Sequence, residues 1–576
     1  MIVAPVAVII VIGRVVSALP AAAAAGAGSH QAARLLVLAV VAGVLVAVQW
    51  LAASAREPVC SALGERVNNR LAAGLMAAVM APPGVAHLEN PATVDLIAVG
   101  RDTFAQFMRP GRLAVELTAL IPARVLMVAA AVVLTTLAWP LGPLFLAAVL
   151  WAEHEGREVA RDAAQTHYGS TQSARRKEYY LGLGTGAEAA KEVRVFGLPG
   201  FLLDGYQRNW SRSHQAASQR SGRQFLAVTA LVTVCAGVIG WLCYQGSRGA
   251  VSIGQAVVCG QATLLGLTAL GSASLSQVRT ELARQALARH DSAVAATKPA
   301  TAESAHDSCG LVLPPASPSV AITFEHVSFA YPGSGTSVLH DLNLTIEAGQ
   351  SLAIVGDNGV GKTTLLKLLC GLYPPAGGRV LVDGTDLASL DLPRWQRHVA
   401  AVFQDSARFE LPAMQNVGFG AVEHATDLAG VVAAAELADA SGLVARLDHG
   451  WDTVLSTQYL HGTDLSGGEW QRLALARALF AVRHGARVLI LDEPAAQLDA
   501  RAEARLYQRF LDLTRGVTAI VVSHRFSTVR LASHIVVVHD GRVTEQGSHD
   551  ELVAADGYYA RMFTLQAASY ELDDPC

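Results

Sequence analysis

Charged side chains are scarce in this chain. Only 16% of its 576 residues are Asp, Glu, Lys or Arg, whereas about a quarter is usual in soluble proteins. The hydrophobic fraction is 52% and the mean hydropathy is +0.34. This composition argues against an ordinary soluble protein and indicates a membrane protein. The net charge of -4 also lacks a strong basic excess, so we expect no nucleic acid as a partner.

Cysteine is rare and follows no pattern. The seven cysteines are odd in number and form neither CxxC pairs nor clusters with histidine. A metal or disulfide role is the minor alternative, and we expect reduced side chains that serve packing. These cysteines are Cys60, Cys235, Cys243, Cys259, Cys309, Cys370 and Cys576.

The chain is too long for a single hydrophobic core, and its two halves differ in composition. The first half, residues 1–290, contains six apolar stretches near the twenty residues that a helix needs to cross a bilayer. We therefore expect a six-span helical membrane domain. The predicted spans are 3–22, 34–54, 115–138, 142–160, 224–246 and 252–274.

The basic residues predict the orientation of these spans. Residues 55–113 and 157–223 are rich in Arg and Lys, whereas the other connections are short and nearly uncharged. Because basic loops stay in the cytoplasm, we expect both termini and the second half there. The predicted location is a cell membrane of the bacterial type, with membrane lipid around the helices.

Three features of this domain stay open. The opening run MIVAPVAVIIVIG lacks a basic segment before its apolar core, which favours an uncleaved helix over a signal peptide. Arg14 either lines a pathway, pairs with a carboxylate, snorkels to an interface or reflects a misplaced start codon. Glu116 is expected at the cytoplasmic end of its helix and Arg124 deeper in it, where an aqueous cavity is one environment. Neither is assigned as a substrate ligand.

A linker rich in Pro, Ala and Ser, residues 291–319, precedes the second domain, residues 320–568, and a short tail, 569–576. In the second domain the strand signal SLAIV is followed by GDNGVGKT and a helical run, the order of a phosphate-binding P-loop. Lys362 would supply a cation to the phosphates, and Thr363 a hydroxyl to Mg²⁺. The predicted ATP-binding residues of this loop are Gly356, Asp357, Asn358, Gly359, Val360, Gly361, Lys362, Thr363 and Thr364.

A second signal is the apolar run VLILDEP, residues 488–494, which ends in two carboxylates. This pattern is typical of a buried parallel strand that delivers acids to a site at its carboxyl end. We expect Asp492 to hold Mg²⁺ and Glu493 to act as general base toward water. An acidic strand cap is the alternative.

These residues lie in an arrangement that resembles the ABC ATPase family. LSGGE, residues 465–469, resembles the ABC signature and lies between the P-loop and the acidic strand, as in that family. The resemblance implies an aromatic residue stacked on adenine, Tyr331, a Q-loop residue, Gln404, a D-loop residue, Asp499, and a switch histidine, His524. Gln404 and His524 would join Glu493 in catalysis, and Gln404 would join Thr363 and Asp492 at Mg²⁺.

The order of membrane domain and ATPase resembles type I ABC exporters over nearly the whole chain. The implied fold is a helical bundle with long helices reaching into the cytoplasm, joined to an α/β ATPase with a β-rich edge and a helical insertion. In that family the signature residues, here Ser466, Gly467 and Gly468, contact ATP held by the other subunit. The resemblance therefore implies a second half-transporter, identical or not.

Details of the motifs suggest a branch of this family. HLENP, EVRVFGL and FQDSARFEL resemble exporters that include lanthipeptide transporters, with residues 83–97 and 191–203 as coupling-helix regions or, alternatively, ordinary surface helices. Leu460 and Ala496 depart from the common pattern, without removing a phosphate, metal or water ligand. We expect an ATP hydrolase that exports a modified peptide. The alternatives are a lipid or hydrophobic drug as cargo, an importer, and an ATP-gated regulator. Because the chain starts at its first helix, we expect no peptidase domain in it.

Overall fold

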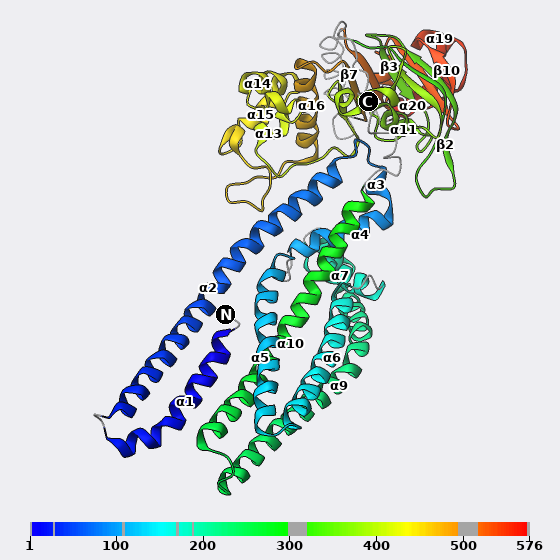
Figure 1. Ribbon diagram of the computed structural model, residues 1–576. Helices are drawn as coiled ribbons and strands as arrows, with labels where there is room; N and C mark the ends of the chain where they lie inside the picture. The colour runs from blue at the N-terminus through cyan, green and yellow to red at the C-terminus, as the bar shows by residue number, and fades with distance from the viewer. Residues whose placement is uncertain are drawn as a thin grey trace. The chain divides into compact units, whose positions relative to one another are not determined.

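Figure 1 shows a computed structural model of the chain. The structure describes residues 3–26, 29–105, 110–168, 172–186, 189–297, 319–493 and 516–572. The chain divides into two compact units. The first holds residues 1–80 and 92–298, and the second holds residues 81–91 and 299–576. Each unit has a hydrophobic core of its own.

The first unit is helical throughout its described residues (Figure 1). Apolar faces of its helices pack around a core that includes Leu134, Phe145 and Leu231, all fully buried. The helices are α1 Val3–Ala25, α2 His30–Met80, α4 Pro91–Ala105, α5 Arg112–Leu137, α6 Leu141–Tyr168, α7 Gln172–Thr185, α8 Ala190–Val195, α9 Pro199–Ser247 and α10 Ile253–Ala296.

Five helices in the described residues are long and apolar enough to cross a membrane: α1, α2, α5, α9 and α10. The fourth predicted span falls on α6, which is not among them because Glu153, Glu155, Arg157 and Glu158 interrupt its apolar run. The sixth crossing therefore stays a prediction. Helix α2 continues past residue 54 to Met80, and α10 continues past the predicted boundary at 290 to Ala296.

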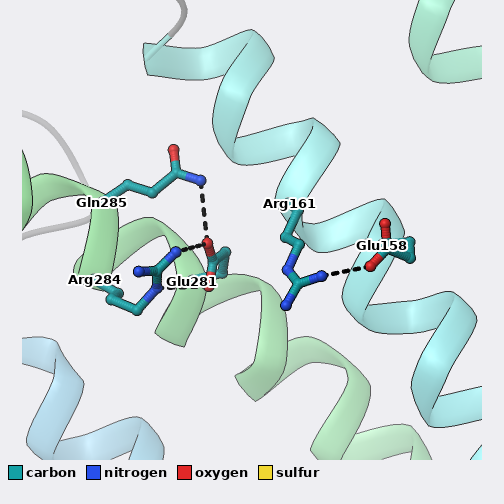
Figure 2. A network of polar contacts seen from close by, with 5 residues as sticks. All are labelled: Glu158, Arg161, Glu281, Arg284 and Gln285. Atoms are coloured by element: carbon teal, nitrogen blue, oxygen red, sulfur yellow. Dashed lines mark hydrogen bonds and ion pairs between the residues drawn. The ribbon is translucent and has the colours of Figure 1, made fainter.

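The carboxyl-terminal halves of α6 and α10 carry charged side chains that form pairs within each helix (Figure 2). Arg161 donates to Glu158 over 2.6 Å, and Arg284 donates to Glu281 over 2.6 and 3.0 Å. Gln285 adds a bond of 3.2 Å to Glu281. Such pairs at helical spacing contribute only about 0.2–0.5 kcal/mol each. They are informative mainly because they place these halves in a polar environment.

Two charges that the sequence left open are neutralised by neighbouring helices. Arg124 of α5 donates to Glu153 of α6 over 3.2 Å, and Arg157 donates to the same carboxylate over 3.2 Å. Glu116 of α5 accepts from Arg279 of α10 over 3.3 Å. The two glutamates are nearly buried, at 5% and 4% exposure. Because a buried carboxylate is costly without a partner, these pairs hold α5, α6 and α10 in register.

The second unit is built on a six-stranded sheet of order β10-β9-β3-β8-β7-β6. Adjacent strands in this sheet are parallel, except that β9 and β10 are antiparallel to each other. The strands are rich in Val, Ile and Leu, as expected for parallel strands covered on both faces. They are β3 Ser351–Val355, β6 Val399–Val402, β7 Val488–Asp492, β8 Thr518–Val522, β9 His534–His539 and β10 Arg542–Gly547.

A second, antiparallel sheet of order β2-β1-β4-β5 forms the predicted β-rich edge. Its strands are β1 Ile322–Ala330, β2 Ser337–Ile346, β4 Gly377–Val382 and β5 Thr385–Asp386. Three helices form the predicted insertion between β6 and α16: α13 Ala413–Gly418, α14 Leu428–Leu437 and α15 Ser441–Val444. The remaining helices are α3 Ala86–Glu89, α11 Lys362–Leu369, α12 Leu392–Gln396, α16 Gly467–Arg483, α18 Phe526–Val529, α19 His549–Ala554 and α20 Tyr558–Leu572. The expected fold class is confirmed.

The segment 81–91, although distant in sequence, is part of the second unit. The Val85 amide donates to the Leu372 carbonyl over 3.0 Å, and the Gln396 amide donates to the Pro83 carbonyl over 2.9 Å. Val85 and Ala86 pack against the core beneath the β-rich edge. This segment overlaps, at residues 83–91, the region 83–97 that the sequence identifies as a candidate coupling helix.

Trp395 offers a test of this core. Its ring is 1% exposed and its indole N–H donates to the Leu369 carbonyl over 2.9 Å, which joins α12 to α11. Trp395→Ala should destabilise the second unit by about 3–5 kcal/mol through the cavity it leaves. Trp395→Phe should cost less, because it retains most of the volume and loses only the hydrogen bond. Thermal unfolding of the purified chain measures both, and equal midpoints for the wild type and the alanine variant would contradict this packing.

Candidate functional site

The glycine-rich turn after β3 has a backbone that only glycine adopts easily. Gly356, Gly359 and Gly361 have φ values of 151°, 83° and 104°. A Cβ atom on Gly356 would lie 2.2 Å from the Val538 carbonyl oxygen. The turn therefore needs glycine both for its conformation and for its close approach to β9. It leads directly into α11, whose first N–H groups lack partners within the helix and attract anions.

Lys362, the first residue of α11, places its ammonium group within this turn. Its Nζ atom donates to the carbonyls of Gly356 over 2.7 Å and Asp357 over 2.8 Å. Burial lowers the pKa of Lys362, while the nearby carboxylates of Glu493, Asp492 and Asp357 raise it. A buried cation held only by carbonyls beside a ring of N–H donors is suited to binding phosphate.

Asp492, the last residue of β7, lies opposite the start of α11. It is 1% exposed and accepts a hydrogen bond from the Thr363 hydroxyl over 2.8 Å. Burial raises the pKa of Asp492, and the bond from Thr363 lowers it in part. A hydroxyl and a carboxylate at this distance fit Mg²⁺, which prefers oxygen ligands and commonly uses one or two protein groups together with phosphates and water.

Glu493 follows with an unusual backbone. Its φ is 49°, a left-handed conformation that is uncommon for a residue other than glycine and often found at functional sites. Its N–H donates to the Val522 carbonyl over 3.0 Å, which ties it to β8. The side chain lies 3.5 Å from Nδ1 of His524, the second residue after β8. This glutamate is therefore held beside both His524 and Asp492.

These groups line one cavity of about 560 Å³. Tyr331 is one of the lining residues; its hydroxyl lies 2.9 Å from the Thr364 hydroxyl and its ring packs edge-on against Phe329 and Tyr373. An aromatic face at the edge of a phosphate site suits a flat heterocycle. The lining residues are Tyr331, Val338, Asn358, Gly359, Gly361, Lys362, Thr363, Thr364, Gln404, Asp492, Glu493 and His524.

Most of the predicted site residues thus meet in this cavity, and three loop residues do not line it. Gly356 and Val360 serve the turn and its packing. Asp357 turns away from the cavity, since its carboxylate accepts a hydrogen bond from Tyr558 of α20 and lies 3.9 Å from His539. Asp499 lies outside the described residues.

The signature residues form a separate site. Ser466 precedes α16, and both its amide and its hydroxyl donate to Glu469 over 2.8 Å. These bonds, and the nearby Arg446, lower the pKa of Glu469. Ser466, Gly467 and Gly468 do not line the cavity around Lys362. Ser466 is exposed, so this helix start is open to a partner.

Sequence reasoning missed several supporting residues. Val338 of β2 lines the cavity, and Gln471 of α16 donates to the Glu493 carbonyl over 3.4 Å. Tyr558 holds Asp357 from a helix that follows it by 201 positions. None of these carries a local sequence signal, because each acts through a contact that only the fold creates.

Comparison with known proteins identifies relatives of the ATPase domain. Residues 339–496 match the ABC transporter family. The ATP-dependent lipid A-core flippase of Nitrosococcus oceani is 39% identical over 246 residues, 43% of this chain and 40% of the flippase. The subtilin transport ATP-binding protein SpaT of Bacillus subtilis is 35% identical over 242 residues, 42% of this chain and 39% of SpaT. The match therefore spans less than half the length of these relatives.

The fold is also similar to a solved structure over nearly its whole length. A bacterial Atm1-family ABC exporter, solved with ATP bound, superposes with a TM-score of 0.72 at 25% identity, covering 98% of each chain. The chain thus contains a nucleotide-binding ABC ATPase domain that follows a helical region. Together with its apolar helices, this identifies an integral membrane protein.

Lys362 is the residue whose loss should affect nucleotide binding most directly. Lys362→Ala removes the buried cation, and we expect ATP affinity to fall about tenfold or more, because hydrogen bonds to charged groups contribute about 1.5–3 kcal/mol. Lys191→Ala, at an exposed lysine of α8, is the matched control. Titration with a fluorescent ATP analogue measures both, and unchanged affinity in the Lys362 variant would contradict the phosphate assignment.

Proposed function

We propose that this chain, which carries an ABC transporter ATPase domain, is one half of an ATP-driven membrane exporter. The observation that carries the proposal is the cavity in which Lys362, Asp492, Glu493 and His524 meet, in a chain that also has five long apolar helices. A phosphate turn with a carboxylate, a general base and a histidine is suited to hydrolysis of a phosphoanhydride. The apolar helices supply a membrane domain on which that energy acts.

The residues have distinct roles in this proposal. The turn and Lys362 bind the phosphates of ATP, and the ring of Tyr331 supports the adenine ring. Thr363, Asp492 and Gln404 would hold Mg²⁺, which neutralises charge on the phosphates when bound. Glu493 orients and polarises the attacking water, and His524 contacts the γ-phosphate. The 3.5 Å separation of Glu493 and His524 supports joint action of these two groups.

A complete site in this proposal requires two chains. Ser466, Gly467 and Gly468 stand apart from the cavity of their own chain, and Ser466 is exposed. A helix start with free N–H groups is suited to the phosphates of a nucleotide bound elsewhere. We infer that each signature completes the site of a second half-transporter, either another copy of this chain or a relative. Asp499 would lie near this junction.

The direction and coupling of transport follow from the same arrangement. We infer that the ATPase and both termini are cytoplasmic, because the loops rich in Arg and Lys flank the membrane helices on that side. The segment 81–91 is held by a backbone bond to Leu372 and by a bond from the side-chain amide of Gln396, which supports its role as a coupling element. The segment 191–203 is proposed as the second coupling element.

A modified peptide is our first choice of cargo. The motifs HLENP and EVRVFGL support it, as does the similarity to a subtilin transport protein. A lipid is the second choice, supported by similarity to lipid A-core flippases. The intact pair Glu493 and His524 argues against a slow ATP-gated regulator.

Reconstitution of the full chain into vesicles tests this function. Wild-type protein and Glu493→Gln are compared for ATP binding, ATP hydrolysis and ATP-dependent movement of a thioether-bridged peptide and of a headgroup-labelled lipid. The variant should bind ATP normally. Its rate of ATP hydrolysis should fall by a factor of about 100 or more, because it lacks the general base. Transport should fall with hydrolysis.

The outcomes separate the parts of the proposal. Near-normal hydrolysis in Glu493→Gln would overturn the role of Glu493. Hydrolysis by the wild type without movement of either cargo class would contradict the exporter function for these cargoes. Movement of the lipid alone would replace the peptide as the first choice.

A further inference from the structure

Arg14 is a cation in the apolar helix α1. It lies eleven residues from either end of α1, between Val3 and Ala25. In the described part of the chain it makes no ion pair. The sequence contains no Asp or Glu in residues 1–56, 117–152 or 224–280, which include the apolar parts of the membrane helices. Among the described residues no carboxylate neutralises Arg14, so its charge is open to an anion from another molecule.

Arg14 lines a cavity of about 560 Å³ between α1, α5 and α10, which we name the Arg14 cavity. Helix α1 contributes Ser17, α5 contributes Thr136, and α10 contributes Gln255 together with its N-cap residue Ser252. No carboxylate lines it. The cavity therefore combines one positive charge with several polar side chains in a region that is otherwise apolar.

Two polar groups of the cavity, on Arg14 and Gln255, have N–H donors for which the structure shows no acceptor within the described residues. The hydroxyls of Ser17 and Thr136 donate to backbone carbonyls of their own helices. The side-chain oxygen of Gln255 accepts from both the amide and the hydroxyl of Ser252. The amide N–H₂ of Gln255 and the guanidinium of Arg14 remain as donors. A guanidinium with a neighbouring amide donor is complementary to a carboxylate or phosphate.

Two glycines bring Arg14 and Gln255 to the same level. A Cβ atom on Gly13 would lie 2.0 Å from Val258 Cγ2, and one on Gly254 would lie 2.7 Å from Ser17 Cβ. Only residues without side chains allow α1 and α10 to approach this closely. Each glycine immediately precedes one of the two donor residues. The helix crossing therefore fixes the geometry of the cavity.

The depth of the cavity fits the headgroup region of a membrane. Gln255 and Glu281, a member of the charged pairs in Figure 2, are 26 residues apart on α10, which corresponds to about 39 Å of helix. A bilayer with its headgroups is about 40–45 Å thick. Leu137 ends α5 and Ser252 is the N-cap of α10, so the cavity lies near the surface opposite the charged pairs even though Arg14 is midway along α1. Anionic groups of lipids or amphiphilic peptides reside at such a surface.

We propose that the Arg14 cavity binds the carboxylate or phosphate of an amphiphilic molecule at the membrane surface opposite the charged pairs of α6 and α10. The apolar part of that molecule would lie against the neighbouring apolar helices. The anion is supplied either by a membrane lipid or by a peptide cargo. The site requires membrane insertion but no ATP turnover, so its test is independent of the proposed transport activity.

Direct binding to the purified full-length chain tests the site, measured by native mass spectrometry in a neutral detergent. The lipid arm compares phosphatidylglycerol with phosphatidylcholine. The peptide arm compares an N-acylated tripeptide that has a free carboxyl end with its amide. The variants are Arg14→Gln, which removes the charge, Arg14→Lys, which keeps it, and Arg34→Gln, which removes an exposed arginine of α2 outside the cavity.

We expect the wild type to prefer the anionic probe about tenfold in at least one arm, because a charged hydrogen-bonded pair contributes about 1.5–3 kcal/mol. Arg14→Gln should lose that preference, while Arg14→Lys and Arg34→Gln should retain it. Unchanged ATP binding verifies that each variant is folded. The proposal is overturned if the wild type shows no preference in either arm, if Arg14→Gln keeps it, or if Arg34→Gln loses it equally.

Discussion

The parallel pairing of β3, β7 and β8 is the constraint on which the candidate nucleotide site depends. Ile354 of β3 and Asp492 of β7 both pair with Val522 of β8, so the three strands end at one level. The carboxyl ends of parallel strands lie at the same edge of a sheet. The phosphate turn, the acidic pair and His524 follow those ends, and residues more than 160 positions apart in sequence meet in one cavity. Burial of these strands therefore fixes the site before any ligand binds.

Charge in the membrane unit follows a complementary rule. Where a carboxylate is available on a neighbouring helix, as for Arg124 with Glu153 and Arg279 with Glu116, the cation is neutralised within the chain. Such pairs hold the bundle in register. Arg14 is different because α1, α5 and α10 surround it with hydroxyls and an amide and with no acid. An unpaired cation among apolar helices is costly. In one region a carboxylate of a neighbouring helix offsets this cost, and at Arg14 we propose that a bound anion does so.

The sequence predicted the features that depend on local pattern. The phosphate turn, the acidic strand and the fold class were recognisable because glycines, a lysine and carboxylates stand at fixed spacing. The lengths of the helices could not be predicted in this way. Hydropathy changes at the membrane surface, but the helical hydrogen bonding of the backbone continues beyond it, and α2 therefore extends to Met80. The partner of Arg124, the contact of Asp357 with Tyr558 and the Arg14 cavity arise from tertiary packing between distant segments, which no local pattern encodes.

The central claim is that one chain holds two half-sites, which only a second chain completes. Complementation tests it most directly: Lys362→Ala chains and Ser466→Arg chains are reconstituted separately and together, and ATP hydrolysis is measured. Each variant alone should be inactive. In mixed pairs the intact Lys362 cavity of one chain meets the intact Ser466 site of the other, so the mixture should hydrolyse ATP well above the sum of the separate preparations. A mixture no more active than that sum would contradict a site shared between two copies of the chain.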